Sequence, residues 1–124
     1  MLASRDSQHG IRNSRNQQIV ASRVLPAFDS ASRRRGLLGR YGFDPEVAMI
    51  IAPCSAIHTF FMRFPIDALF VARDGTVLKA SESIVPWRMA GRLGAYAVVE
   101  LAPGTIARSD TRSGDLIQLT PALP

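Results

Sequence analysis

The sequence predicts a mainly β domain of the α+β class, in which six or seven short strands form a compact barrel-like or strongly bent sheet. The second half of the chain alternates short apolar segments of strand length with turns that contain Gly, Pro and Asp. One of these turns holds Asp74 and Gly75, a pair typical of β-hairpins because both residues tolerate positive φ. Helix-forming residues occur in one stretch near the start and one near the end, so we expect an N-terminal helix and a short C-terminal helical turn.

Length and composition predict a single domain. The chain has 124 residues, of which 47% are hydrophobic, enough to bury one core without a disulfide or a structural metal. Residues 1–16 are rich in Arg, Ser, Gln and Asn, so we expect a disordered tail there and one domain over residues 17–124. We expect a cytoplasmic location, because the tail lacks a signal-peptide core, no segment suits a membrane span, and the single cysteine agrees with a reducing compartment.

The first half of the chain predicts two strands with a helix between them. Residues 18–25 alternate apolar or β-branched residues loosely with polar ones, which indicates a strand that ends at Pro26. Residues 31–38 contain helix formers, follow Asp and Ser residues that can cap a helix, and precede Gly39, which suits a helix C-terminus. The apolar run at residues 48–52 indicates a short buried strand.

The second half predicts further strands and one helical turn. Residues 57–63 indicate a strand, both of whose faces we expect to be largely buried. Residues 66–72 and 76–84 are the two arms of the predicted Asp-Gly hairpin. The other expected elements are a loop, a strand, a short helix capped by Thr105 and a last strand, at residues 85–94, 95–101, 105–110 and 116–119.

Five segments of the chain carry a family resemblance. In order, they are RGLLGR, IAPCSAIHTFFMRFPIDALFVARDGTVL, VPWR, VVELAPGT and GDLIQL. Together they resemble the domain of unknown function 192 family from about residue 18 to residue 119, and HTFFMRFPID is the most specific string. The resemblance implies a compact, β-rich domain that usually stands alone, and it implies no reaction. Many relatives carry export signals that this chain lacks, so the resemblance and the sequence differ on localisation.

Three residues of the central block suggest a hydrolase or transferase. Cys54 is a candidate nucleophile, His58 a candidate base and Asp67 a candidate orienting acid, because an imidazole can activate a thiol and a carboxylate can fix the imidazole tautomer. Cysteine is also among the most buried residue types, so an inert structural thiol is the more common outcome. We therefore treat catalysis as an alternative and expect a protein that is not an enzyme.

A second group of polar residues suggests a binding cleft. Trp87 and Arg88 follow a proline in a loop flanked by glycines, and such a pair can stack on a ligand and hold an anion. Asp67 lies at the start of an otherwise apolar strand, where a buried acid needs a partner: backbone amides, Arg63, Arg88 or a ligand. The ligand-binding candidates are His58, Arg63, Asp67, Trp87 and Arg88.

Metal and nucleic-acid binding are not favoured by the sequence. The predicted domain offers only Cys54, His58 and scattered acids as metal ligands, fewer than a zinc site needs, so we expect neither a metal nor another cofactor. The net charge of +5 permits binding to polyanions, but the basic residues are dispersed and no nucleic-acid motif surrounds the three arginines at 33–35.

The leading hypothesis is an accessory domain of unknown activity that binds a small molecule or a protein partner in a polar cleft. A hydrolase or transferase that uses Cys54, His58 and Asp67 is one alternative. A basic nucleic-acid-binding module is another, and it predicts affinity that falls steeply as salt rises.

Overall fold

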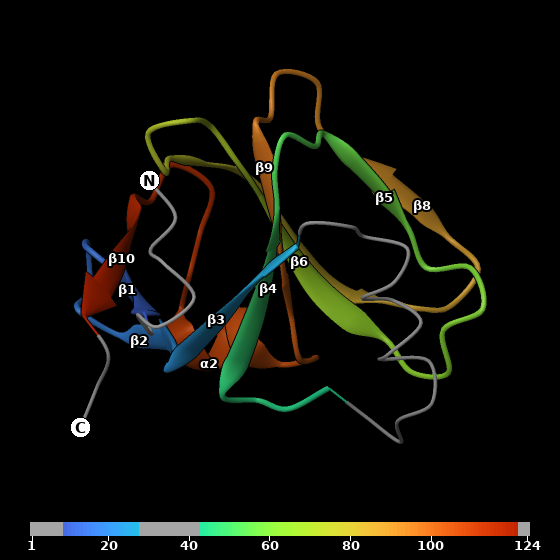
Figure 1. Ribbon diagram of the computed structural model, residues 1–124, viewed down its shortest axis with the longest axis horizontal. Helices are drawn as coiled ribbons and strands as arrows, with labels where there is room; N and C mark the ends of the chain where they lie inside the picture. The colour runs from blue at the N-terminus through green and yellow to red at the C-terminus, as the bar shows by residue number, and fades with distance from the viewer. Residues whose placement is uncertain (1–8, 28–42, 122–124) are drawn as a thin grey trace.

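The computed structural model describes residues 9–27 and 43–121, and Figure 1 shows their arrangement. These residues form ten strands and one short helix. In chain order the elements are β1 (His9–Asn13), β2 (Ile19–Ala21), β3 (Arg23–Ala27), β4 (Val47–Ile51), β5 (Ala56–His58), β6 (Ile66–Val71), β7 (Val77–Ile84), β8 (Met89–Gly91), β9 (Ala97–Leu101), α2 (Thr105–Ser109) and β10 (Ile117–Pro121).

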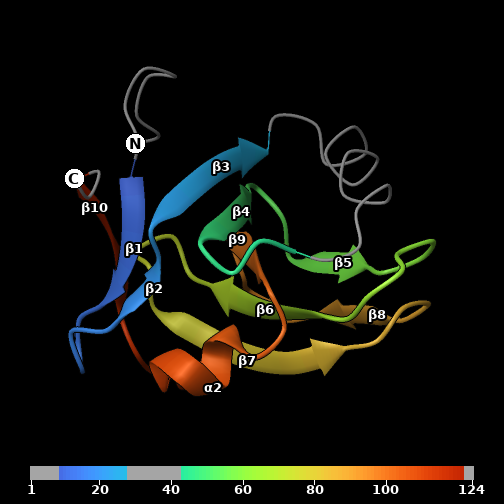
Figure 2. The same ribbon diagram turned by 90° about the horizontal axis from the view of Figure 1, so that it is seen from below.

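The described strands form three sheets. Strands β3-β4-β9-β6-β7 make a five-stranded sheet in which β3 and β4 are parallel and the other neighbours are antiparallel. Strands β10-β1-β2 and β5-β8 make two smaller antiparallel sheets. In Figures 1 and 2 the three-stranded sheet lies on one side of the five-stranded sheet and the β5–β8 pair lies on the other.

The strands β6 and β9 of the five-stranded sheet are buried on both faces. Along β9, Val99 and Leu101 pack into one hydrophobic core, which we call the cavity-side core, together with Ile11 of β1. Val98 packs into a second core, the tip-side core, together with Ile57 of β5. Because side chains alternate across a strand, a sheet with two apolar faces requires a covering layer on each side.

The predicted hairpin and C-terminal helical turn are confirmed. Strands β6 and β7 pair antiparallel around the Asp-Gly turn, and α2 occupies the predicted helical segment. The cap differs from the prediction, since Gly104 is the N-cap residue and Thr105 is buried within the helix. The helix amide of Ile106 instead donates to the Asp67 carboxylate at 2.9 Å.

The mainly β class is confirmed, whereas the barrel-like sheet is not. Among the described residues the strands make three separate sheets, because the apolar segments are apolar on both faces and the central sheet therefore lies between two layers. A barrel would bury one face only. The predicted N-terminal helix, at residues 31–38, lies outside the described residues.

The prediction of a disordered tail is wrong for residues 9–16. Strand β1 is the central strand of its sheet, and Ile11 is only 1% exposed. Backbone pairing with β2 and β10 on both sides orders this polar segment, although it contributes few apolar side chains. The domain therefore begins earlier than residue 17. Residues 1–8 lie outside the described part of the chain.

Two predicted strands are shorter than expected. The strand expected at 18–25 is divided into β2 and β3 at Ser22. The strand expected at 57–63 ends at His58, because the chain turns at Phe61, whose φ is 67°. Its faces are not both buried, since Phe61 is 66% exposed. The loop expected at 85–94 contains a short strand, β8, that pairs with β5.

A buried carboxylate joins the N-terminal strands to the C-terminal strand. One Asp115 oxygen accepts a hydrogen bond from Arg15 Nε at 2.7 Å, and the other accepts from Asn13 Nδ2 and from the backbone N–H of Arg112, both at 2.8 Å. The hydrogen bond from Arg15, supported by that from Asn13, lowers the pKa of Asp115 from 3.8 to about 2 despite the opposing effect of burial. The ionised carboxylate therefore stabilises the folded state.

This network predicts a defined acid sensitivity. Because the folded pKa of Asp115 lies below its unfolded value, its contribution is complete above about pH 4 and is lost as the pH falls toward 2. Asp115→Asn should lower the free energy of unfolding by about 1–3 kcal/mol at neutral pH. Urea unfolding of both proteins from pH 7 to pH 2 measures the difference, which should shrink in the acid range. A difference independent of pH would contradict this assignment.

The turn between β6 and β7 predicts a contrast between two glycines. Gly75 and Gly114 have φ values of 97° and 96°, but a Cβ at Gly75 would overlap the carbonyl oxygen of Ile117, whereas a Cβ at Gly114 would meet nothing. Gly114→Ala should cost about 1–2 kcal/mol for the left-handed backbone. Gly75→Ala should cost at least about 1 kcal/mol more, since the hairpin must move away from β10. Equal thermal unfolding midpoints for the two variants would disprove the close packing.

Candidate functional site

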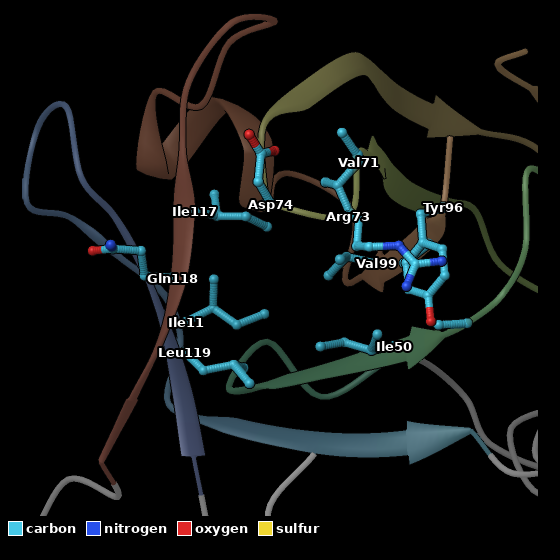
Figure 3. Close-up of a pocket in the computed structure, with 14 residues that line it drawn as sticks. Ile11, Ile50, Val71, Arg73, Asp74, Tyr96, Val99, Ile117, Gln118 and Leu119 are labelled. Atoms are coloured by element: carbon cyan, nitrogen blue, oxygen red, sulfur yellow. The ribbon is translucent and has the colours of Figure 1, made fainter. Parts of the chain in front are cut away.

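A cavity of about 540 Å³ lies between the three-stranded sheet and the five-stranded sheet. Figure 3 shows Ile11 and Leu119 reaching into it from one wall and Ile50 and Val99 from the other. The turn at residues 73–75 borders it as well. The sheets therefore border a mainly apolar cavity that is open to solvent and lies next to the cavity-side core.

Strand alternation makes the walls apolar. On β10, Ile117 and Leu119 face the cavity, whereas Gln118 points away from it (Figure 3). Gln118 instead accepts a hydrogen bond from the Ser14 hydroxyl at 2.9 Å. Val99 is 1% exposed on the central strand β9. The period of two residues thus leaves branched aliphatic side chains around the cavity.

Polar groups lie at the border of the cavity near the β6–β7 turn. The guanidinium carbon of Arg73 lies 4.2 Å from the centroid of the Tyr96 ring, and both residues line the cavity. Asp74 accepts a hydrogen bond from the backbone N–H of Thr76 at 2.9 Å, and this bond lowers the pKa of the Asp74 carboxyl. This border therefore holds one stacked cation and one carboxylate that already serves the turn.

The structure brings three of the predicted site residues together on the other side of the five-stranded sheet. Strand β5 pairs with β8, so that His58 lies opposite Met89. Trp87 and Arg88 directly precede Met89 in the sequence. The His58 ring lies 4.7 Å from that of Phe60, which in turn stacks 5.7 Å from Trp87. Arg63 is exposed in the loop that follows. These residues form an exposed surface rather than the border of the cavity.

Asp67 does not belong to that surface. It is 0% exposed, and its two oxygens accept hydrogen bonds from the backbone N–H groups of Ser83, at 2.8 Å, and Ile106, at 2.9 Å. Ser83 lies where β7 carries an irregularity opposite β6 and has a φ of 50°. Asp67 therefore fixes a β-bulge and the start of α2, which is the backbone-amide role considered for it from the sequence.

The Cys54 thiol and the Asp67 carboxylate both make hydrogen bonds to the backbone. The Cys54 thiol donates to the carbonyl oxygen of Ala56 at 3.0 Å, and the Asp67 carboxylate is held by the two backbone amides. His58 Nδ1 accepts a hydrogen bond from the Phe60 backbone N–H at 3.3 Å. A nucleophile and an orienting acid would both have to contact the imidazole.

Within the described ranges, no group of three or more His, Cys, Asp or Glu side chains could hold a metal ion. In the same part of the chain, no helix is long and apolar enough to cross a bilayer.

Sequence reasoning missed the cavity residues because most of them are ordinary members of apolar strands. Ile11 belonged to a segment assigned to the tail, and Arg73 belonged to a turn. The only available signal was the double-sided apolar pattern of the central strands, which implies two covering layers and an interface where a cavity can form.

The Cys54 environment predicts low reactivity. A thiol that donates to a carbonyl must be protonated, whereas the thiolate is the nucleophile. Iodoacetamide should label the folded protein more slowly than the urea-unfolded protein, with no change in His58→Ala, as mass spectrometry can measure. Cys54→Ala should lower the free energy of unfolding by about 1 kcal/mol. Fast labelling that depends on His58 would instead support a nucleophile.

Two solved structures share this fold. One, a putative transcription regulator from Sinorhizobium meliloti 1021, has a TM-score of 0.76 and 24% identity, over 91% of this chain and 94% of that one. The other, a protein of unknown function from Novosphingobium aromaticivorans DSM 12444, has a TM-score of 0.72 and 24% identity, over 90% of this chain and 83% of that one. At this identity the similarity shows the fold alone.

No curated protein matches the chain. The family model of DUF192, described as "Uncharacterized ACR", matches residues 11–119. The match covers both small sheets, the five-stranded sheet and α2. The resemblance seen in the sequence is thereby confirmed, and the chain belongs to the domain of unknown function 192 family.

Proposed function

We propose that this domain binds a small, mainly apolar molecule with one acidic group in the cavity between the three-stranded and five-stranded sheets. The observation that carries the proposal is the cavity itself, whose volume of about 540 Å³ falls in the range of small-molecule sites. Small-molecule sites are typically concave and lined mainly by apolar side chains, as this one is. A space of this size between two sheets therefore suits a ligand.

The lining supports an aliphatic ligand. Isoleucine, valine and leucine side chains from five strands reach the cavity, among them Ile11, Ile50, Val99 and Leu119. An apolar ligand would remove these side chains from water, at about 25 cal/mol for each Å² of apolar surface. The walls offer no comparable partner for a sugar or a nucleotide, which would leave hydroxyl groups unpaired.

Arg73 supports an acidic group on that ligand. Its guanidinium carbon lies over the Tyr96 ring, 4.2 Å from the centroid. A guanidinium has five N–H donors, so a carboxylate can bind the donors that are not turned toward the ring. Asp74, which follows Arg73 in the sequence, already accepts a hydrogen bond from the Thr76 amide. An acid at the border of the cavity would thus meet an oriented cation.

The proposal keeps the small-molecule binding that was expected from the sequence, but it places the ligand at a different site. A cleft formed by His58, Arg63, Asp67, Trp87 and Arg88 is not supported, because Asp67 is buried in a separate role. A non-enzymatic, accessory role remains our proposal, and the hydrogen bond from the Cys54 thiol to the Ala56 carbonyl supports a structural role for that cysteine.

Titration with medium-chain fatty acids tests the proposal. Calorimetry should show saturable binding of decanoate and weaker binding of decanol, which lacks the acidic group. Arg73→Gln should weaken decanoate binding by roughly tenfold, the equivalent of about 1.4 kcal/mol, and leave decanol unchanged. Leu119→Trp should prevent binding of both, because its larger side chain occupies the cavity.

Arg92→Gln is the matched control, since Arg92 is exposed and does not line the cavity. It should bind decanoate as the unchanged protein does. Circular dichroism checks that each variant is folded. Equal decanoate affinity in Leu119→Trp and the unchanged protein would contradict the assignment of the cavity as the binding site.

A further inference from the structure

The end of the β5–β8 layer carries a second surface, which is separate from the cavity. We propose that this surface docks the protein on an anionic lipid bilayer. We call it the aromatic tip and define it as residues 58–64 and 85–89. In both Figure 1 and Figure 2 the loop after β5 and the loop before β8 project side by side, away from the three-stranded sheet.

The aromatic tip exposes large apolar side chains. Phe61 is 66% exposed, Trp87 is 55% exposed and Met89 is 74% exposed. Val85 in the same loop is also among the exposed apolar residues. A cluster of this kind on two neighbouring loops differs from the single exposed apolar residues that are normal on protein surfaces.

Hydrogen bonds to Thr59 hold the two loops as one unit. The Thr59 hydroxyl donates to the Val85 carbonyl at 2.7 Å and accepts from the Arg88 backbone N–H at 2.9 Å. The Thr59 backbone N–H donates to the Arg88 carbonyl at 2.8 Å, and its carbonyl accepts from the Trp87 N–H at 3.1 Å. Thr59 is 0% exposed, so these bonds are protected from water. The apolar side chains are therefore presented from a fixed frame.

The backbone holds two of these aromatic residues in an unfavourable conformation. Phe61 and Trp87 have φ values of 67° and 66°, in the left-handed region that bulky residues rarely adopt. Residues kept in this region cluster at functional sites, because the surrounding structure must compensate for the strain. Here the conformation turns two aromatic rings outward at the end of the molecule, where burial in the core does not explain them.

The charge of the aromatic tip is uniformly positive. The charged side chains of its two segments are Arg63 and Arg88, and the segments contain no aspartate or glutamate. Arg63 and Arg88 are exposed, and Asp67, the next acid after the first segment, is fully buried. The whole chain has a formal net charge of +5. Aromatic and aliphatic side chains surrounded by arginines match the interface of a bilayer that contains anionic lipids.

The packing of Trp87 favours lipid over nucleic acid. Its ring is stacked on that of Phe60, with the two centroids 5.7 Å apart. It also makes a T-shaped contact with the Phe61 ring, with centroids 4.6 Å apart. A base-stacking platform would need a free aromatic face. A cluster whose rings pack on one another, with Met89 beside it, can instead enter the interfacial region as a unit.

Vesicle binding tests the docking proposal. Trp87 is the only tryptophan in the chain, so its emission reports on this surface alone. With vesicles of phosphatidylcholine containing about one third phosphatidylglycerol, emission should shift to the blue and become sensitive to brominated lipid. With phosphatidylcholine alone the change should be much smaller. An unchanged spectrum with the anionic vesicles would overturn the proposal.

Two variants and a control separate docking from general charge attraction. Phe61→Asn should reduce vesicle partition by at least about tenfold without unfolding, because asparagine tolerates a positive φ. Arg88→Gln should reduce it by about fivefold. Arg23→Gln, a control on β3, should change it by less than about twofold. Equal partition of Phe61→Asn and the unchanged protein would overturn the proposal. So would quenching of Trp87 by oligothymidylate or polyglutamate without a response to vesicles.

Discussion

The structure depends on one constraint: the five-stranded sheet has two apolar faces and must be covered on both. Leu69 and Phe70 are neighbours on β6, both are fully buried, and they belong to different cores. Neither small sheet has two apolar layers of its own, so each is stable only when packed on the central sheet. The positions of both candidate surfaces follow from how the two covering layers meet this sheet.

The two covering layers differ in how closely they pack. The three-stranded sheet is connected to the rest of the chain by the Asp115 network and by the turn at Gly75, which approaches the Ile117 backbone closely. Between these attachments its apolar face leaves the cavity. On the opposite side, Ile57 and Met62 are buried in the tip-side core, between the β5–β8 pair and the five-stranded sheet. Its loops extend past the sheet and expose the aromatic tip.

Asp67 links the core to the aromatic tip. Its carboxylate holds the bulge at Ser83 and the first turn of α2, and the bulge redirects β7 just before Val85. Removing that carboxylate would leave the buried amide of Ile106 unpaired. A residue that the sequence marked as unusual thus holds the end of β7, and the loop that contains Trp87 follows this strand in the chain.

Local patterns in the sequence were sufficient for some elements and not for others. The Asp-Gly hairpin and α2 follow from short-range signals in the sequence, and both are present, although the cap of α2 is Gly104 and not Thr105. Strand β1 could not be predicted, because its order comes from backbone pairing with β2 and with β10, more than one hundred residues away in the chain. The same reason hid the cavity, since Ile11 and Leu119 face it only after this pairing. By contrast, the grouping of His58 with Trp87 and Arg88 was predicted only because these are unusual polar residues in otherwise apolar segments.

Methyl-resolved NMR with bound decanoate is the most direct measurement of the central claim, that the cavity between the sheets is a ligand site. Intermolecular NOEs should connect the ligand to the methyl groups of Ile11, Ile50 and Leu119, which line the cavity. The methyl groups of Ile57 and Ile66, in the tip-side core, should keep their chemical shifts. NOEs to the tip-side core, or saturable binding without NOEs to the cavity methyl groups, would contradict the account.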